Sequence, residues 1–288
     1  MPRVQRLECI SNAKVNFEGG NLTSDSGLML YKEFGKKLGF SQTIRDNFHL
    51  NDGINHRDHE NEDVFFLRIF LNAIGYHADD DSDDLNHDDN IKIMLEKDSL
   101  ASQPTISRAN NRLNTETMKQ TQQSNFDLLD KLYKLEPPEI IIFDFDSTYN
   151  ETHGEQYGSD YNGHYGLNCY HPLVLFDGVT GDCIKAALRA GNVYTSRRVC
   201  PFASSVFKWY RKRFKDIKIF SRSDSGFTDP KFYRLHESNK IFYTIRLKAN
   251  NTLYESAKPI EKKFDEKYNK EDQYDYQVVY GEFKYKAG

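Results

Sequence analysis

The sequence IIIFDFD at residues 140–146 decides the predicted fold. A short run that is almost wholly apolar is typical of a strand buried on both faces of a sheet. Side chains alternate across a strand, so Asp144 and Asp146 should point to the same face, with their Cα atoms about 7 Å apart. Burying a carboxylate beside isoleucine and phenylalanine costs free energy unless a partner or a metal compensates, which makes both aspartates candidate site residues. The alternative is that either one caps the turn that begins at Ser147.

The elements that follow this run predict an α/β core. Residues 166–176 and 182–189 have the pattern of two strands, joined by the turn DGVTG at 177–181. Next come an amphipathic helix at 201–214 and a strand at 217–222. They are followed by a helix that opens at Asp229-Pro230 and ends near 238, and by a strand at 241–247. Three strands, a helix, a strand, a helix and a strand give a mixed sheet with helices. This is the order expected of an RNase H-like domain.

The sequence before this core has a different pattern. Residues 24–38, 61–74 and 104–113 have the spacing of helices, so residues 1–135 should form a mostly helical N-terminal region. Glu136-Pro137-Pro138 breaks the pattern and predicts a boundary, with the core at residues 136–250. The polar tail after the core carries a predicted late strand at 276–285.

A second acidic candidate follows the strand at 217–222. Asp224 stands directly after this strand in the sequence SRSDSGF, and Gly226 permits a sharp turn. Aspartates at the ends of two sheet strands suggest a shared site, because Mg²⁺ prefers carboxylate and phosphate oxygens. Two such ions about 4 Å apart serve phosphodiester displacement, which normally needs a third carboxylate. The alternative for Asp224 is an ordinary polar loop between a strand and a helix.

Bulk properties exclude several classes of protein. The chain has 288 residues, of which 38% are hydrophobic and 14% aromatic, so it is not wholly disordered. It has no apolar run long enough to span a bilayer and no secretory signal. Its four cysteines have neither zinc-site nor disulfide-framework spacing, and a reducing cytoplasm is the default location. The net charge of −4 counts mildly against nucleic acid as a partner of the whole chain.

Local patterns nevertheless offer candidate DNA contacts. Arg211, Lys212 and Arg213 form a basic stripe on the predicted helix at 201–214. Arg108 and Arg112 lie in the donor-rich sequence SQPTISRANNR at 102–112. An ordinary solvated helix face explains either set as well. Seven aspartates between residues 79 and 89 are better explained as solvated acidity than as a cation site, because they lack the spacing of an EF-hand loop.

Several motifs resemble the IS1380-type DDE transposases of bacteria. They are FDFDSTYNETHGEQYGSDYNGHYGLNCYHPLVLFDG at 143–178, LRAGN at 188–192, SRSDSGF at 221–227, GYHADDDSDDLNHDDNIKIML at 75–95 and LASQPTISRANNRL at 100–113. The resemblance runs from about Gly20 to the last residue. It implies an RNase H-like fold and two Mg²⁺ or Mn²⁺ ions held by Asp146 and Asp224. Asp144 is a further candidate because of its place at the end of the strand. The resemblance also implies double-stranded DNA as partner, both transposon ends and target, a homodimer for end pairing, and a bacterial cytoplasmic location.

One departure from this family bears on activity. The family's third acid is a glutamate on a helix beyond an inserted β-rich segment, and residues 251–288 are expected to begin that segment. No residue here maps onto that glutamate, so the C-terminal part of the core is expected to be missing. Glu237, Glu255 and Glu261 are expected on the solvated surface, and Glu255 could substitute only if the tail folded back as the core helix. The expectation is an incomplete, inactive copy of a transposase. The alternatives are a non-catalytic DNA-binding remnant and an RNase H-like nuclease.

Overall fold

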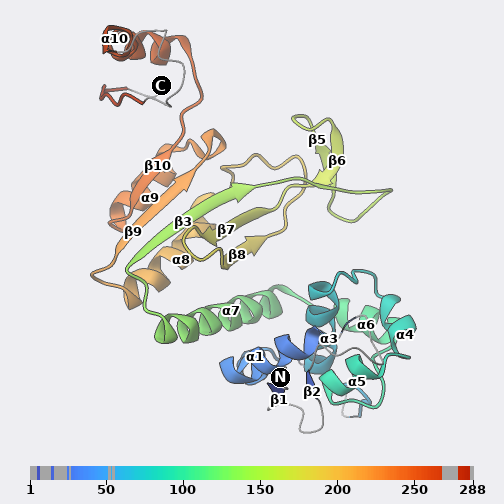
Figure 1. Cartoon of the computed structure of the whole chain (residues 1–288). Coiled ribbons are helices and arrows are strands. Elements are labelled where there is room, and N and C mark those ends of the chain that lie inside the picture. The colour runs from blue at the N-terminus through green and yellow to red at the C-terminus, as the bar shows by residue number, and fades with distance from the viewer. Residues whose placement is uncertain are drawn as a thin grey trace. The chain divides into compact units, whose positions relative to one another are not determined.

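The computed structural model describes residues 5–6, 14–15, 25, 27–50, 53, 56–267 and 278–285. The chain divides into two compact units, Met1–Pro138 and Glu139–Gly288, each of which is described by itself (Figure 1). Within the described residues, no helix combines the length and the apolar character that a membrane span requires.

The first unit is mostly helical, as predicted. Three buried side chains of one helix, Val64, Leu67 and Leu71, follow helical spacing and pack with Ile106 into its main core. The longest described helix is capped by Asn114, whose side chain accepts hydrogen bonds from backbone amides of the first turn. The helices are α1 (Leu28–Leu38), α2 (Phe40–Asn47), α3 (Asn61–Ala73), α4 (Asp81–Leu85), α5 (Asp89–Leu95), α6 (Gln103–Asn110) and α7 (Thr115–Leu135), and the short strands β1 (Gln5–Arg6) and β2 (Lys14–Val15) pair antiparallel.

The second unit is built on a five-stranded mixed sheet. Its strands are β3 (Ile140–Ser147), β7 (Leu173–Asp177), β8 (Cys183–Ala187), β9 (Lys218–Ser223) and β10 (Phe242–Ile245), in the order β10-β9-β3-β7-β8. The central strand β3 runs antiparallel to β7 and parallel to β9, and β9 runs parallel to β10. The helices α8 (Val199–Arg213) and α9 (Pro230–Ser238) follow β8 and β9 in the chain (Figure 1). This order confirms the predicted RNase H-like core.

Strand β3 is fully buried on one face only, which corrects the prediction of burial on both. Phe143 stacks on Phe207 of α8, with ring centroids 5.4 Å apart, and Phe145 meets Phe232 of α9 edge to face at 5.2 Å. The intervening residues Ile142 and Asp144 are only half-buried. The reason is that α8 and α9 pack against one face of the strand, so the alternating side chains have different surroundings.

The predicted strand at 166–176 is in fact two strands. Residues 167–170 form β6 (Leu167–Tyr170) in a separate small sheet with β4 (Asn150–Glu151) and β5 (Asp160–Asn162), in the order β4-β6-β5. The strand β7 begins after His171-Pro172. Proline has no amide hydrogen to donate to a ladder, so the chain changes sheets at this point.

The tail differs from the β-rich segment expected at residues 251–288. Asn251–Lys267 forms the helix α10 (Figure 1), and residues 278–285 have no regular structure, so that part of the predicted strand at 276–285 is wrong. Residues 276–277 lie outside the described part of the chain. Leu253, Ala257, Ile260 and Phe264 recur at spacings of three and four, and the intervening lysines and glutamates are good helix formers.

Candidate active site

Asp146 and Asp224 lie at the ends of neighbouring strands. The parallel register pairs Asp144 with Arg222 and Phe145 with Ser223. Asp146 and Asp224 are the residues that directly follow this last pair, and adjacent strands are about 4.8 Å apart. Both aspartates are exposed. Two carboxylates that are 78 positions apart in the chain thus follow the last paired residues of adjacent parallel strands.

Backbone amides orient both carboxylates. Asp146 Oδ1 accepts a hydrogen bond of 2.7 Å from the amide of Ser147. Asp224 precedes a short 3-10 helix (Ser225–Phe227), and its Oδ1 accepts a bond of 2.9 Å from the amide of Gly226. A Cβ on Gly226 would lie 2.9 Å from Cβ of Thr195 and 3.1 Å from Asp224 Oδ1. A side chain at this position would have to displace Thr195, which accounts for the glycine.

A cavity of about 500 Å³ opens beside Asp224. Its lining includes Ser147 after Asp146, Lys248 beyond β10, and Tyr165 from the turn between β5 and β6. Burial raises the pKa of the Tyr165 phenol, and the charges of Asp146 and then Asp224 raise it further. The Tyr165 phenol therefore lies within the electrostatic influence of both carboxylates.

The sequence LRAGN forms a loop that closes this cavity from the side of β8. Arg189 Nε donates to the carbonyl of His171 at 2.9 Å, and its Nη1 donates to the carbonyl of Thr195 at 3.0 Å. A Cβ on Gly191 would lie 2.2 Å from the carbonyl oxygen of Asp160 and 2.6 Å from that of Cys169, so the loop presses directly on the small sheet. The Thr195 hydroxyl is 3.0 Å from that of Ser147. The loop thus connects the small sheet to the end of β3.

Reasoning from the sequence missed Tyr165, Thr195 and Lys248 as residues of this site. Tyr165 and Lys248 are single polar or aromatic residues in loops, and no spacing rule sets them apart. The motif at 143–178 was the signal that could have found Tyr165, because this motif contributes to the cavity, whereas Thr195 lies beyond the motif at 188–192.

Asp144 is engaged elsewhere. Its two oxygens accept hydrogen bonds from Nε and Nη2 of Arg222, the second at 2.7 Å. The hydrogen bond with Asp144, and then its charge, raise the pKa of Arg222. These two hydrogen bonds hold the Asp144 carboxylate against β9. Arg222 is the residue before Ser223, where β9 ends.

The described residues contain no group of three histidine, cysteine or acidic side chains placed to hold a metal ion. Glu237 accepts a hydrogen bond of 3.1 Å from the hydroxyl of Tyr243. Glu255 on α10 forms an exposed ion pair of 2.7 Å with Lys258. Glu261 is exposed on the same helix. Within the described part of the chain, none of these three glutamates joins Asp146 and Asp224 in a metal-binding group.

The candidate DNA contacts have different surroundings. Arg211 donates to the backbone carbonyls of Asn239 and Ile217, each at 2.9 Å, and to that of Lys240. These bonds give Arg211 a structural role and leave its predicted phosphate contact without support. Lys212 is exposed, and the Arg213 guanidinium lies over the Trp209 ring at 3.9 Å.

In the first unit, Arg108 is exposed and donates to the Thr105 hydroxyl at 3.1 Å, while Arg112 donates to Asn61 at 2.8 Å.

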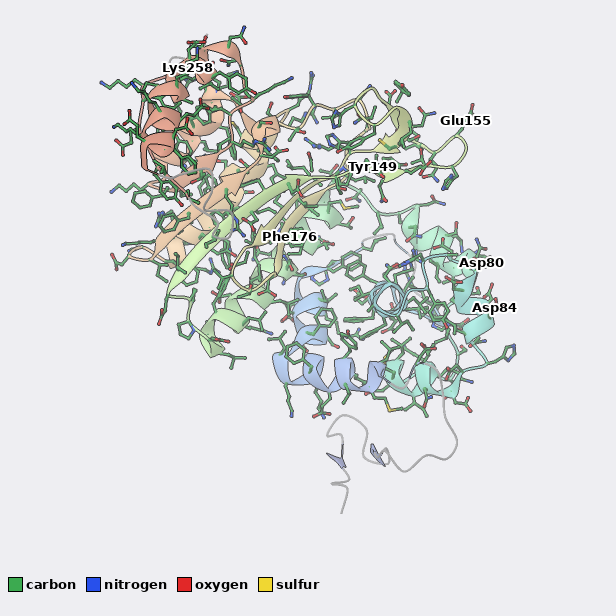
Figure 2. All side chains as sticks on the ribbon, turned by 45° about the horizontal axis from the view of Figure 1, so that its top comes forward. Asp80, Asp84, Tyr149, Glu155, Phe176 and Lys258 are labelled. Atoms are coloured by element: carbon green, nitrogen blue, oxygen red, sulfur yellow. The ribbon has the colours of Figure 1, made fainter. Side chains whose placement is uncertain are left out.

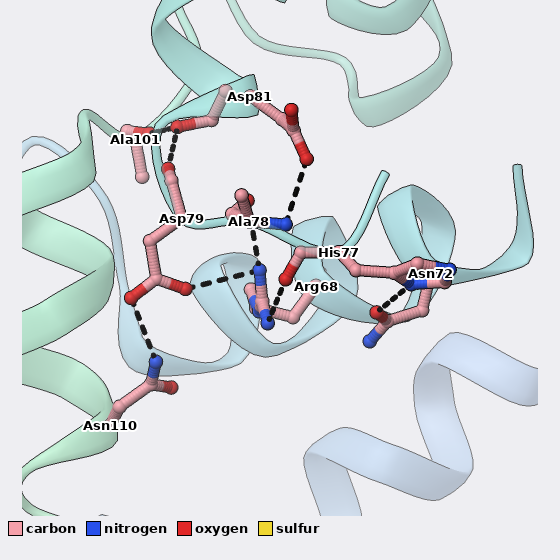
Figure 3. A network of polar contacts seen from close by, with 9 residues as sticks. Arg68, Asn72, His77, Ala78, Asp79, Asp81, Ala101 and Asn110 are labelled. Atoms are coloured by element: carbon pink, nitrogen blue, oxygen red, sulfur yellow. Dashed lines mark hydrogen bonds and ion pairs between the residues drawn. The ribbon is translucent and has the colours of Figure 1, made fainter. Parts of the chain in front are cut away.

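The aspartates at 79–89 have structural partners rather than a common cation site. Asp79 forms an ion pair of 3.1 Å with Arg68, and Asp81 accepts a bond of 2.8 Å from the amide of Ala78 (Figure 3). Asp80 and Asp84 are exposed at the outer edge of this unit (Figure 2). Capping, pairing and solvation therefore account for these acids.

Comparisons with known proteins identify the family. The family model described as transposase DDE domain group 1 matches residues 7–288. No curated protein matches the chain. Among solved structures, the chain is similar to piggyBac transposase in a synaptic complex with hairpin DNA, at 15% identity and a TM-score of 0.37, over 76% of this chain and 49% of that one. It is also similar to Mos1 transposase in a paired-end complex with the left transposon end, at 13% identity and a TM-score of 0.27, over 86% of this chain and 81% of that one.

The crystal structure of the catalytic domain of Mos1 mariner transposase matches as well, at 13% identity and a TM-score of 0.29, over 56% of this chain and 84% of that domain. The chain spans about half the length of the piggyBac transposase chain. The family model, in contrast, matches nearly all of this sequence. The chain belongs to the transposase DDE domain group 1 family.

Proposed function

We propose that this chain is the metal-binding core of a DNA transposase, which cleaves DNA at transposon ends and joins them to target DNA. The observation that carries this proposal is the parallel pairing of β3 and β9, whose last pair, Phe145 and Ser223, directly precedes Asp146 and Asp224. Asp224 lines an open cavity. The family supports the same activity. Within it, the order of the motifs at 143–178, 188–192 and 221–227 supports assignment to the IS1380 type.

The two carboxylates fit Mg²⁺ or Mn²⁺. Both are exposed hard oxygen donors, and the amides of Ser147 and Gly226 each engage one oxygen of the adjacent carboxylate. Two ions, when bound, activate the attacking oxygen and stabilise the leaving one. Asp146 and Asp224 would hold them. Lys248 lines the same cavity, where its ammonium group would attract a DNA phosphate.

Manganese binding tests this arrangement directly. We expect Asp146→Asn and Asp224→Asn each to weaken Mn²⁺ binding at least about tenfold, measured from the electron paramagnetic resonance signal of free Mn²⁺. Asp144→Asn should bind Mn²⁺ as the unchanged chain does, since its carboxylate is held by Arg222. Asp265→Asn on the exposed face of α10 is the matched control. Equal binding by all four variants and the unchanged chain would show that the aspartates do not share a metal.

A second candidate function is DNA binding without catalysis. It is favoured by the lack, among the described residues, of a group of three metal-binding side chains. Incubation with Mg²⁺ or Mn²⁺ and DNA that contains the gene with its flanking sequence separates the candidates. Cleavage and end joining that require Asp146 support the transposase. Cleavage without joining indicates a nuclease, and salt-dependent binding without cleavage indicates a DNA-binding protein.

A further inference from the structure

Tyrosine side chains gather on the small sheet and loops beside the two carboxylates. Tyr149 is 45% exposed, at the point where β3 leads into the small sheet (Figure 2). Tyr161 on β5 is 57% exposed, and Tyr194 in the loop after LRAGN is 65% exposed. Single exposed aromatic residues are ordinary. Here two lie in the segment that carries the small sheet and one in the loop after LRAGN, all near a candidate active site, which indicates a surface that binds flat, apolar groups.

The Tyr149 ring packs at an angle against a second tyrosine ring, that of Tyr165, which lines the cavity. The rings of Tyr149 and Tyr165 have centroids 4.5 Å apart and planes inclined by 37°. The imidazole of His164 meets the Tyr165 ring edge to face at 4.9 Å. Tyr165 lines the cavity together with Asp224, and its phenol is influenced by the charges of both site aspartates. The aromatic pair is thus part of the same site as the carboxylates.

The turn that carries Tyr165 is fixed by a buried side chain. Asn162 Oδ1 accepts hydrogen bonds from the backbone amides of His164 at 2.9 Å and Tyr165 at 3.3 Å. Its Nδ2 donates to the carbonyl of Gly191 at 2.7 Å. Because Asn162 is 7% exposed and joins the turn to the LRAGN loop, the Tyr165 ring is held in place before any ligand arrives. Such preorganisation reduces the ordering cost of binding.

We propose that Tyr149 and Tyr165 bind an unpaired nucleobase next to the phosphodiester that Asp146 and Asp224 act on. This inference rests on the proposed function and extends it to the form of the DNA. A nucleobase lies one sugar away from its phosphate, so a metal site and an aromatic surface in one cavity suit the two ends of a nucleotide. Bases in an intact duplex are stacked on one another, and only an unpaired or displaced base can stack on a protein ring.

The test compares two DNA probes and matched tyrosine variants. One probe is a blunt duplex, and the other is the same duplex with a single-stranded overhang that carries the fluorescent base 2-aminopurine. Base stacking on an aromatic side chain contributes about 1–3 kcal/mol, which corresponds to about 5- to 150-fold in affinity. We expect Tyr149→Leu and Tyr165→Leu to lose about this much affinity for the overhang probe and to relieve the quenching of 2-aminopurine. Binding of the blunt duplex should not change.

Two further variants identify the ring as the source of the effect. Tyr165→Phe keeps the ring and should bind the overhang as the unchanged chain does, and Tyr254→Leu on α10 is a control for loss of an exposed tyrosine. Equal binding of both probes by the unchanged chain would overturn the inference, as would a loss in Tyr165→Phe that matches that in Tyr165→Leu. These outcomes leave Mn²⁺ binding by Asp146 and Asp224 unaffected. A chain that binds neither DNA nor Mn²⁺ would overturn the proposed function itself.

Discussion

At the scale of single residues, the candidate site depends on glycines as much as on acids. Gly226, whose amide donates to Asp224, lies too close to Thr195 for a side chain, and Gly191 lets the LRAGN loop pack against the small sheet. In each case the neighbouring atoms occupy the space that a side chain would need.

Gly191 provides a test of this close packing. In Gly191→Ala the new Cβ would lie 2.2 Å from a backbone oxygen, which cannot rotate away, so the loop or the small sheet must shift. We expect the free energy of unfolding to fall by about 1–3 kcal/mol in urea titrations, as in other overpacked sites. Gly163→Ala is the matched control, since nothing lies within 4 Å of the Cβ it would add. Equal stability of the two variants would contradict the packing described here.

At the scale of elements, α9 carries a buried histidine beneath the central strand. His236 is fully buried, and its ring contacts those of Phe232, Phe207 and Phe145. Its Nδ1 lies 2.8 Å from the carbonyl oxygen of Phe232, which can only accept, so Nδ1 carries the hydrogen. Burial lowers the pKa of His236 below its ordinary value of 6.5. The helix therefore packs with this imidazole neutral.

Acid should consequently destabilise the second unit. Below pH 6.5 the unfolded chain binds a proton at His236 that the folded chain does not yet bind, so the free energy of unfolding falls as the pH falls. The fall is at most about 1.4 kcal/mol per pH unit, and it stops at the lower pKa of the folded state. Urea titrations between about pH 5 and 7 should show this slope. The slope should disappear in His236→Phe and persist in the control His153→Phe, because the side chain of His153 is exposed. An unchanged slope in His236→Phe would exclude His236 as the source of the pH dependence.

The core elements were predictable from the sequence because their patterns are local. The apolar run of β3, the glycine-containing turn before β8 and the spacing of α8 and α9 each fix an element without knowledge of its neighbours. The division of residues 166–176 between two sheets was not predictable, since it depends on Pro172 and on a partner strand, β5, of only three residues. The helix at 251–267 was missed because the family resemblance was given more weight than the helical spacing of Leu253, Ala257 and Ile260.

At the scale of the whole molecule, any binding to DNA must come from local groups. The chain has a net charge of −4, so its average field repels phosphates. The positions of Asp146 and Asp224 were predictable as strand ends, but their pairing required the sheet order. The partners of Arg211 could not be read from the sequence, because they are carbonyls from segments that meet only in the fold.

Salt dependence distinguishes the basic residues that are proposed to contact DNA from those with a structural role. We expect Arg108→Gln and Lys212→Gln to reduce the slope of log affinity against log salt concentration by about one each, as the loss of one phosphate contact should. Arg211→Gln should instead lower the stability of the second unit, because it removes three donors to backbone carbonyls. Fluorescence anisotropy with duplex DNA measures the slopes, and Lys119→Gln, which lies in an exposed ion pair with Glu116, is the control. Unchanged slopes in Arg108→Gln and Lys212→Gln would remove these residues from the proposed interface.

The two carboxylates differ in how firmly the fold holds them. Asp146 lies within the middle strand, where it is paired with Val174 of β7, whereas Asp224 stands just past the end of β9, at the start of a single tight turn. Amide hydrogens around Phe145 should exchange with solvent slowly, and those around Gly226 much faster. The backbone at Asp146 is therefore expected to be rigid, and the backbone at Asp224 more flexible. When an ion or a DNA strand binds, the turn that carries Asp224 should move more than β3 does.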